Sequence, residues 1–480
     1  MLEKDLPELS GSVIYFVGVK GTGMAALAEL FRTRGAIVTG SDVPDKFYTD
    51  VILAELGVPV YECFDENNIP EATKLLIYSA AYNPDSHPEI VKAKEMGIPI
   101  FSYAEALGFF SRQMPAAGIC GVHGKTTTTA IAGTIMKEYG LAGSVLTGSA
   151  AANFDGHSTL VKGGNFFIAE TCEYRRNFLN FSPDFLVITS VEPDHLDYYK
   201  DYNDILSAFV EYGEKLSENG RIIYCADDEG AVQAASIIKE KRADIKLTPY
   251  GFKAEGDYKI LLGKNSSGQQ QFKISRFGDF NFVLKVPGRH NILNSTAAAA
   301  LVSFLAEKEN FKGNEEEIIA KALLDFRGTK RRSEVLGEAG GVIFIDDYGH
   351  HPKAIKTTLA GLKDFYPDRR LIVDFMSHTY SRTEALIDDF AESFLDADMV
   401  SLHKIYASAR EKCGKISGQD LYNKVCKNQD NVIYNEEVMD VYDKMSRKLK
   451  PGDLFVTMGA GDNWKLGYKL YENFSEDRQE

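Results

Sequence analysis

The sequence is poor in cysteine and has no long apolar run. Its six cysteines are spread through 480 residues, and none belongs to a Cys-x-x-Cys pair, so neither a disulfide framework nor a zinc-binding module is expected. No uncharged apolar stretch reaches the length of a membrane-spanning helix, and residues 1–9 lack the apolar core of a secretory signal. These absences predict a cytoplasmic protein with no membrane partner.

Basic residues are outnumbered as well. The chain has 54 lysines and arginines against 69 aspartates and glutamates, a net charge of −15. Nucleic acids bind basic surfaces, so this deficit argues against nucleic acid as the main partner. It leaves room for a small anionic substrate held in a local positive pocket. The length predicts about three globular domains, and a 44% share of hydrophobic residues can give each of them a core.

What the chain does contain is a glycine-rich loop between a strand and a helix. An apolar run at 116–120 precedes the loop, and helical spacing continues after it to Tyr139. Backbone N–H groups and a helix start attract an anion, a lysine reaches the outer phosphates, and the next hydroxyl commonly binds Mg²⁺. The spacing G-x-x-G-K-T is shorter than the strict P-loop pattern, so a glycine turn capped by threonine stays as the alternative. The predicted nucleotide loop comprises Gly121, Val122, His123, Gly124, Lys125, Thr126 and Thr127.

Two further strands are expected to end beside this loop. The apolar run at 165–169 ends in Glu170, and the run at 184–189 leads to His195. A hydroxyl, a carboxylate and an imidazole beside phosphates could complete a Mg²⁺ sphere. The predicted metal ligands are Thr126, Glu170 and His195, whereas a helix cap or an ion pair would explain either of the last two alone.

The first 113 residues have the pattern of a small nucleotide-binding unit. A strand at 12–17 leads into a glycine loop and a helix, and a second strand at 36–39 follows. The glycines are spaced G-x-x-G-x-G, which misses the dinucleotide fingerprint but still suits a nucleotide diphosphate. An acid at the end of the second strand can accept from ribose or base donors, or simply cap a turn. The predicted contacts are Gly21, Thr22, Gly23, Met24, Ser41 and Asp42.

Later segments add polar residues at helix starts and strand ends. His290 and Asn291 open a long alanine-rich helix, where a nucleobase edge or a plain helix N-cap would suit them. Arg331 and Arg332 belong to a basic linker that could clamp a γ-phosphate. Further polar residues follow the strands at 341–345 and 370–375, namely Asp346, Tyr348, His350, His378 and Arg382.

The pattern therefore predicts an α/β protein of three domains. We expect a Rossmann-like domain at 1–113, a P-loop ATPase-like domain with a mixed sheet at 114–326, and a second Rossmann-like domain at 327–480.

Taken together, these motifs resemble those of the Mur ligase family, in family order and over nearly the whole chain. The similar stretches are residues 18–24 with 40–42, 121–129, 192–197, 288–294, 330–336, 346–352, 378–383 and 458–462. The resemblance implies three domains that bind a UDP-sugar, ATP and an amino acid in turn. It implies a ligase of cytoplasmic peptidoglycan precursor synthesis, with ATP and Mg²⁺ as cofactors. ATP would activate the lactyl carboxylate of UDP-N-acetylmuramate as an acyl phosphate, which the amine of L-alanine attacks.

The resemblance also implies roles for single residues. Lys125, His195, Arg331 and Arg332 would be catalytic, with either arginine at the γ-phosphate. His290 and Asn291 would contact adenine, and Asp346 the ribose. The alanine site would be lined by Tyr348, His350, His378 and Arg382.

The chain departs from the family pattern at two places. Cys172 replaces an acid within the run 170–176, which also gains Arg175 and Arg176, and Lys20 replaces a glycine in the first loop. The arginines could grip a carboxylate-bearing or larger substrate, so a ligase that adds a murein tripeptide is one alternative, and a non-catalytic nucleotide-binding regulator is another. The absence of lysine between Lys200 and Lys215 favours the alanine-adding member of the family. A monomer and a homodimer both remain open.

Overall fold

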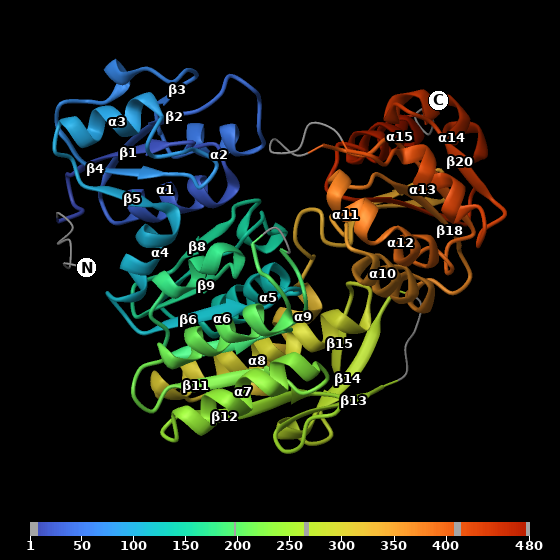
Figure 1. Ribbon diagram of the computed structural model, residues 1–480. Helices are drawn as coiled ribbons and strands as arrows, with labels where there is room; N and C mark the ends of the chain where they lie inside the picture. The colour runs from blue at the N-terminus through green and yellow to red at the C-terminus, as the bar shows by residue number, and fades with distance from the viewer. Residues whose placement is uncertain (1–7, 196–197, 264–267, 408–413, 477–480) are drawn as a thin grey trace. The chain divides into compact units, whose positions relative to one another are not determined.

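The computed structural model describes residues 8–195, 198–263, 268–407 and 414–476. Leu196 and Asp197, which end one of the family-like stretches, lie outside these ranges. The described chain forms three β-sheets with helices on their faces (Figure 1). Within it, no helix combines the length and the apolar character needed to cross a membrane. The predicted α/β class with three domains is confirmed.

The first sheet is parallel, with the order β3-β2-β1-β4-β5. Its central strand is buried along almost its whole length, as its apolar sequence requires. The strand order reverses between β1 and β4, and doubly wound sheets bind ligands at such a switch point. The elements are β1 (Val13–Val17), α1 (Thr22–Thr33), β2 (Ile37–Ser41), α2 (Thr49–Glu55), β3 (Val60–Tyr61), β4 (Thr73–Tyr78), α3 (Pro88–Glu95), β5 (Ile100–Ser102) and α4 (Tyr103–Ser111).

The second sheet is mixed and has the order β15-β14-β13-β12-β11-β10-β6-β9-β7-β8. The fully buried β6 lies between β9 and β10 and is parallel to both, so the three strands end at the same edge. The antiparallel partner of β7 is β8, in agreement with the predicted mixed sheet. Its strands are β6 (Ala116–Cys120), β7 (Gly143–Leu146), β8 (Thr159–Val161), β9 (Phe166–Glu170), β10 (Phe185–Ile188), β11 (Arg221–Cys225), β12 (Lys246–Gly251), β13 (Tyr258–Leu262), β14 (Gln270–Ile274) and β15 (Phe282–Leu284).

Helices α5 to α9 accompany this sheet. Helix α5 follows the glycine loop directly and ends at Gly140, whose φ of +69° suits a glycine at a helix C-cap. The helices are α5 (Lys125–Tyr139), α6 (Tyr202–Glu214), α7 (Glu229–Lys241), α8 (Arg289–Lys308) and α9 (Glu315–Asp325), with a short 3₁₀ turn, η3 (Tyr174–Asn180), after β9.

The third sheet has the order β16-β17-β21-β18-β19-β20; β16 is antiparallel to β17, and the other neighbouring strands of the described chain pair in parallel. Its core joins the buried strands to α10 on one face and to α15 on the other. The elements are β16 (Glu334–Ala339), β17 (Val342–Asp347), α10 (Pro352–Phe365), β18 (Arg370–Phe375), α11 (Tyr380–Ala385), α12 (Ile387–Glu392), β19 (Met399–Leu402), α13 (Gly418–Val425), β20 (Val432–Tyr434), α14 (Tyr442–Lys448), β21 (Asp453–Met458) and α15 (Trp464–Glu476).

The contacts of the chain divide it into two compact units. The first contains residues 1–262, 273–282 and 293–326, and the second contains 263–272, 283–292 and 327–480. The first unit thus holds the first sheet and most of the second, and the second unit holds the third sheet. The domain boundaries after residues 113 and 326 remain predictions.

Candidate functional site

The glycine loop between β6 and α5 is shaped for close approach of its backbone. Gly121 has φ +135° and Gly124 has φ +82°, conformations that favour glycine. A Cβ at Gly121 would collide with the hydroxyl of Thr189, and one at Gly124 would come within 2.6 Å of Asn294 Oδ1. Thr126 is buried in the first turn of α5. The predicted cradle of backbone N–H groups at a helix start is therefore present in form.

The loop is fixed against the end of β10. Val122 N donates to Ser190 O at 3.1 Å, and His123 N donates to Ser190 Oγ at 3.0 Å. Thr189 Oγ1 in turn donates to His123 O at 2.5 Å. Thr189 and Ser190 thus position a loop some 70 residues earlier in the chain, a role that their sequence does not signal.

Lys125 turns its side chain back toward the loop and an acid. Its ammonium donates to Gly121 O, to Val122 O at 3.4 Å and to Glu173 Oε1 at 3.1 Å, and it lies 3.0 Å from Glu173 Oε2. Burial alone would lower the pKa of Lys125, but the charge of Glu173 raises it overall. Burial alone would likewise raise the pKa of Glu173, and Lys125 and His195 lower it instead. Both groups are therefore charged near neutral pH.

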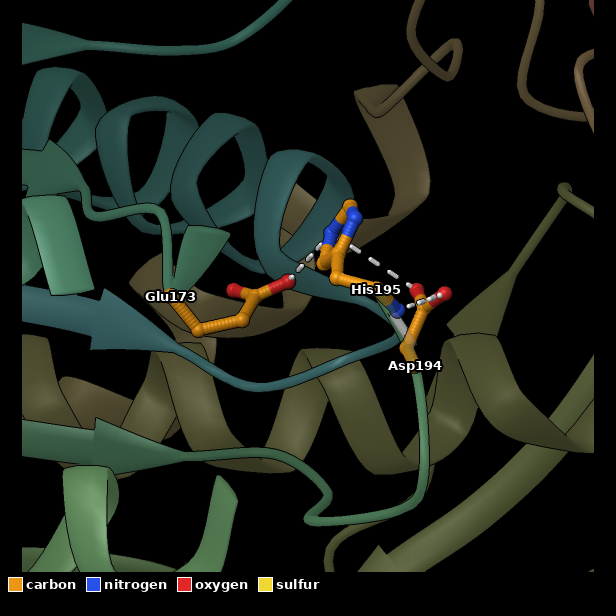
Figure 2. A group of neighbouring side chains, drawn as sticks. All are labelled: Glu173, Asp194 and His195. Atoms are coloured by element: carbon orange, nitrogen blue, oxygen red, sulfur yellow. Dashed lines mark hydrogen bonds and ion pairs between the residues drawn. The ribbon is translucent and has the colours of Figure 1, made fainter. Parts of the chain in front are cut away.

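Glu173, Asp194 and His195 form one group that could hold a metal ion, with donor atoms all within 4.8 Å of one another. Figure 2 shows the carboxylate of Glu173 turned toward the imidazole of His195, with Oε1 3.5 Å from Nε2. His195 Nε2 is 3.8 Å from Asp194 Oδ2, and His195 has φ +52°. Two carboxylates and an imidazole are suitable donors for a divalent cation.

The three predicted metal ligands do not all belong to this group. His195 does, but Glu170 accepts a hydrogen bond from Gly148 N at 2.8 Å. The carboxylates beside His195 are those of Glu173, three residues after Glu170, and of the adjacent Asp194. The acidic run at 170–176 was predicted to lie here, but Glu173 was not predicted as a ligand. The donor set still fits Mg²⁺, because carboxylates stand beside a glycine loop that suits phosphates.

The added arginines of the acidic run have different surroundings. Arg175 and Arg176 both have left-handed backbones, with φ +53° and +56°. Arg176 bonds to Asp204 at 2.8 Å and to Glu211 at 2.7 Å, both on α6. Arg175 is exposed and lies over the ring of Tyr174, 5.4 Å from its centroid. Arg176 therefore fastens the turn that carries Glu173.

The first glycine loop adjoins the start of α1, as predicted, with Gly21 at its N-cap. Tyr48 donates to Thr22 Oγ1 at 3.0 Å, while a Cβ on Gly23 would press on the ring of Tyr103. Met24 has a buried side chain. This part of the cradle can offer a ligand mainly backbone N–H groups.

Ser41 and Asp42 use their side chains inside the fold. Ser41 Oγ donates to the buried Glu89 at 2.5 Å. Asp42 accepts from Lys20 N at 2.7 Å, Val43 N at 2.8 Å and Tyr82 OH at 3.3 Å. Both residues therefore shape the loops at the switch point, and their predicted contact with a nucleotide is not tested.

Lys20, the departure in this loop, is also an internal anchor. Its ammonium reaches Val43 O at 3.0 Å, Asp45 O at 3.1 Å, Glu62 at 3.1 Å and Asp50 at 3.3 Å. It is 1% exposed, so it secures the segment after β2 rather than presenting a charge to solvent.

In the second unit, His290 and Asn291 lie at the start of α8, as predicted. Asn291 Nδ2 donates to Pro287 O at 2.7 Å, and burial lowers the pKa of His290, partly offset by Asp347. His290 is therefore a neutral, half-buried imidazole at the start of the helix. Their predicted contact with adenine is not tested.

Arg331 and Arg332 differ sharply although they are neighbours. Arg331 Nε bonds to Asp346 at 2.9 Å, and its Nη2 donates to Gly459 O at 2.8 Å and Gly461 O at 3.2 Å. Both guanidinium groups lie over the ring of Tyr348, 5.1 Å from its centroid for Arg331 and 5.2 Å for Arg332. Asp346 also accepts from Thr457 at 2.8 Å; burial raises the pKa of its carboxyl to about 6, with Arg331 and Thr457 opposing the rise.

The four predicted residues of the amino-acid site come together in the second unit. The ring of His350 lies 5.3 Å from that of Tyr348 and 5.9 Å from that of His378. Burial and the nearby charges of Arg382 and Arg332 lower the pKa of His350 to about 3. His350 Nδ1 is 3.0 Å from Tyr348 O, and only an N–H can bond to a carbonyl, so the lone pair is on Nε2.

Comparison with known proteins finds Mur ligase family models matching three successive parts of the chain. Residues 13–114 match the description "Mur ligase family, catalytic domain", residues 119–302 "Mur ligase middle domain", and residues 331–461 "Mur ligase, glutamate ligase domain". The chain is 49% identical over 473 residues to the UDP-N-acetylmuramate–L-alanine ligase of Treponema pallidum (strain Nichols), covering 98% of each protein.

Two solved structures share the fold. The UDP-N-acetylmuramate-alanine ligase of Thermotoga maritima has a TM-score of 0.77 at 24% identity, over 97% of this chain and 99% of the other. A murein peptide ligase from Psychrobacter arcticus has a TM-score of 0.65 at 22% identity, over the same shares. At these identities the two structures show the fold alone.

Proposed function

Because this chain belongs to the Mur ligase family, we propose that it is an ATP-dependent ligase that joins L-alanine to the lactyl carboxylate of UDP-N-acetylmuramate. The observation that carries the proposal is the 49% identity, over 98% of the chain, to a ligase of that name. The substrates suggest a cytoplasmic step of peptidoglycan precursor synthesis. Whether the ligase acts as a monomer or a homodimer is left to experiment.

Each sheet is proposed to serve one substrate. The first glycine loop, residues 18–24, lies at the switch point of the first sheet and suits the diphosphate of a UDP-sugar. The loop at 121–127 suits the phosphates of ATP, with Lys125 at their outer end. Tyr348, His350, His378 and Arg382 are proposed to bind L-alanine, with Arg382 pairing with its carboxylate.

The metal-competent group supports Mg²⁺ as the cofactor. We propose that Glu173, Asp194 and His195 hold the ion, with Thr126 and Glu170 contributing as the family resemblance implies. A bound Mg²⁺ would neutralise charge on the transferred phosphoryl group.

The reaction proposed for these residues has two steps. A lactyl carboxylate oxygen attacks the γ-phosphorus of ATP, the bond to ADP breaks, and an acyl phosphate forms. The amine of alanine then attacks the carbonyl carbon, the amide forms, and phosphate leaves. Lys125 neutralises charge in the first step. In the second step His350, a neutral imidazole with its lone pair on Nε2, can accept a hydrogen bond from the amine of alanine, and the proton lost on amide formation leaves with the phosphate.

The test is phosphate release from ATP and Mg²⁺ in the presence of UDP-N-acetylmuramate. L-alanine, glycine, L-serine and the tripeptide L-Ala-γ-D-Glu-diaminopimelate are compared as acceptors. Release with L-alanine is the expected result, and the other two amino acids measure how strict the site is. Release with the tripeptide alone would instead identify a recycling ligase, and no release with any acceptor would identify a nucleotide-binding regulator.

A further inference from the structure

Glu173 is a buried carboxylate that faces two different cation sites. Its side chain is 2% exposed, and its oxygens lie 3.1 and 3.0 Å from Lys125 Nζ. The same carboxylate lies 3.5 Å from His195 and is one of the three grouped metal-competent side chains. One acid therefore links the lysine of the nucleotide loop to the residues suited to a divalent cation.

The lysine has no donor to spare in this arrangement. An ammonium has three N–H donors, and the acceptors around Lys125 Nζ are Gly121 O, Val122 O and the carboxylate of Glu173. To donate to a nucleotide phosphate, Lys125 must give up one of these bonds. Of these three acceptors, only the carboxylate of Glu173 also belongs to the group that could hold a divalent cation.

The turn that carries Glu173 is firmly held. Tyr199 OH donates to Glu173 O, and Arg176 fastens the turn to α6 through Asp204 and Glu211. The backbone at Glu173 is thus fixed from two sides, while its carboxylate is within reach of both Lys125 and His195. The same carboxylate can therefore serve either Lys125 or a bound cation without a change in the backbone.

We propose that Glu173 is a positioning residue that makes Lys125 available to nucleotide phosphates only when a divalent cation is bound. Glu173 holds the ammonium of Lys125 in the absence of the cation. When Glu173, Asp194 and His195 bind the cation, the carboxylate releases Lys125, and the ammonium turns toward the phosphates. The inference rests on the proposed ATP site and is independent of which amino acid is the acceptor.

The test measures ADP affinity by isothermal titration calorimetry, in EDTA and in excess Mg²⁺, for the wild type and for Glu173→Gln. The variant loses the charge that competes for Lys125 but keeps the shape of the side chain. In EDTA it is expected to bind ADP about tenfold tighter than the wild type, a gain of about 1.4 kcal/mol. The increase in ADP affinity on adding Mg²⁺ is expected to be smaller than in the wild type, because Lys125 is no longer held by a charged carboxylate in the absence of the cation.

Glu138→Gln is the matched control. It removes the same charge from α5, the helix that follows the nucleotide loop, at a carboxylate that pairs with Lys321 at 2.6 Å instead of Lys125. Its ADP affinity in EDTA is expected to change by less than about threefold. Equal tightening in both variants would reduce the effect to general charge removal and overturn the proposal.

Glu173→Asp gives a second route in case Glu173→Gln does not fold, which a melting curve will reveal. It keeps the charge but draws the carboxylate back from Lys125, so an ADP affinity in EDTA above that of the wild type is expected. Unchanged or weaker binding in either folded variant would overturn the proposal. ADP binding requires no acceptor, so this result stands apart from the test of alanine ligation.

Discussion

At the scale of single residues, adjacent side chains in this protein have separate tasks. Arg331 and Arg332 both lie over the ring of Tyr348, but Arg331 is also held by a fully buried carboxylate and two backbone carbonyls. The family resemblance gave either arginine the γ-phosphate. The structure shows that the guanidinium of Arg331 is already engaged, so we propose Arg332 for that role.

Arg331→Ala is therefore expected to lower the stability of the protein, and Arg332→Ala is expected to lower the kcat of the ligation reaction. The first variant leaves Asp346 buried without its cation, which costs about 3–5 kcal/mol of unfolding free energy. The second removes a group that would stabilise charge on the transferred phosphoryl, so kcat should fall by at least about a hundredfold. Urea unfolding and ATP-dependent phosphate release measure the two effects. Arg331→Ala with unchanged stability, or Arg332→Ala with unchanged kcat, would contradict the division.

At the scale of elements, the turn after β9 depends on an anchor to a helix that follows it in sequence. Arg175 and Arg176 have the same side chain and the same left-handed backbone, but only Arg176 bonds to Asp204 and Glu211 on α6. They form a natural matched pair, because substitution by alanine at either position removes the same charge and keeps the same left-handed backbone.

Arg176→Ala should therefore lower the melting temperature more than Arg175→Ala. The anchor is partly exposed and consists of two ion pairs, so the expected difference in unfolding free energy is about 1 kcal/mol. Thermal unfolding of both variants in one buffer measures it. An equal loss in the two variants would mean that the contacts with α6 add nothing to the stability of the turn.

A second element-scale contact joins β18 to the end of β19. His403 is buried, with Nε2 2.8 Å from Asp374 Oδ2 and Nδ1 3.0 Å from Asn435 O. Both neighbours are acceptors, so both ring nitrogens need a proton. Burial alone would lower the pKa of His403, but the charge of Asp374 raises it above its ordinary value overall.

This pair predicts a pH-dependent contribution to stability. Since the folded pKa is raised, the stabilisation is complete below the unfolded pKa, about 6.5, and is lost as the pH rises through the folded pKa. His403→Gln should cost about 3 kcal/mol at acidic pH and less at alkaline pH. Melting temperatures of the wild type and the variant, taken across this range, measure the gap. A gap that is constant or widens with pH would contradict a protonated His403.

At the scale of the whole molecule, the strand-end pattern explains why much of the architecture was predictable. Buried apolar runs ending in a glycine, an acid or hydroxyl residues specified β6, β9 and β10 respectively, and parallel pairing brought their ends to one edge. The family and the α/β class were predicted from such motifs and are confirmed.

Side-chain direction at those ends was not predictable, because distant residues decide it. Glu173 faces His195, and the left-handed turn that follows Glu173 is anchored on α6. The side chain of Ser41 points into the fold because its hydroxyl donates a hydrogen bond to Glu89, which lies far along the chain. Local sequence spacing identifies neither the acid that faces His195 nor the acceptor of the Ser41 hydroxyl. The sequence therefore indicated where the candidate site lies but not which acid faces His195.

The proposed division of labour among the sheets leads to a prediction for Lys125→Ala. The variant should lose ATP-dependent phosphate release, because no other loop residue carries the positive charge that the outer phosphates need. It should still bind UDP-N-acetylmuramate, since the first glycine loop belongs to another sheet and shares no strand with β6. Calorimetry with the UDP-sugar measures binding, and a melting curve checks folding, because Glu173 loses its main partner. A folded variant that has lost both activities would show that UDP-sugar binding depends on the nucleotide loop, and the proposed assignment of one substrate to each sheet would then be wrong.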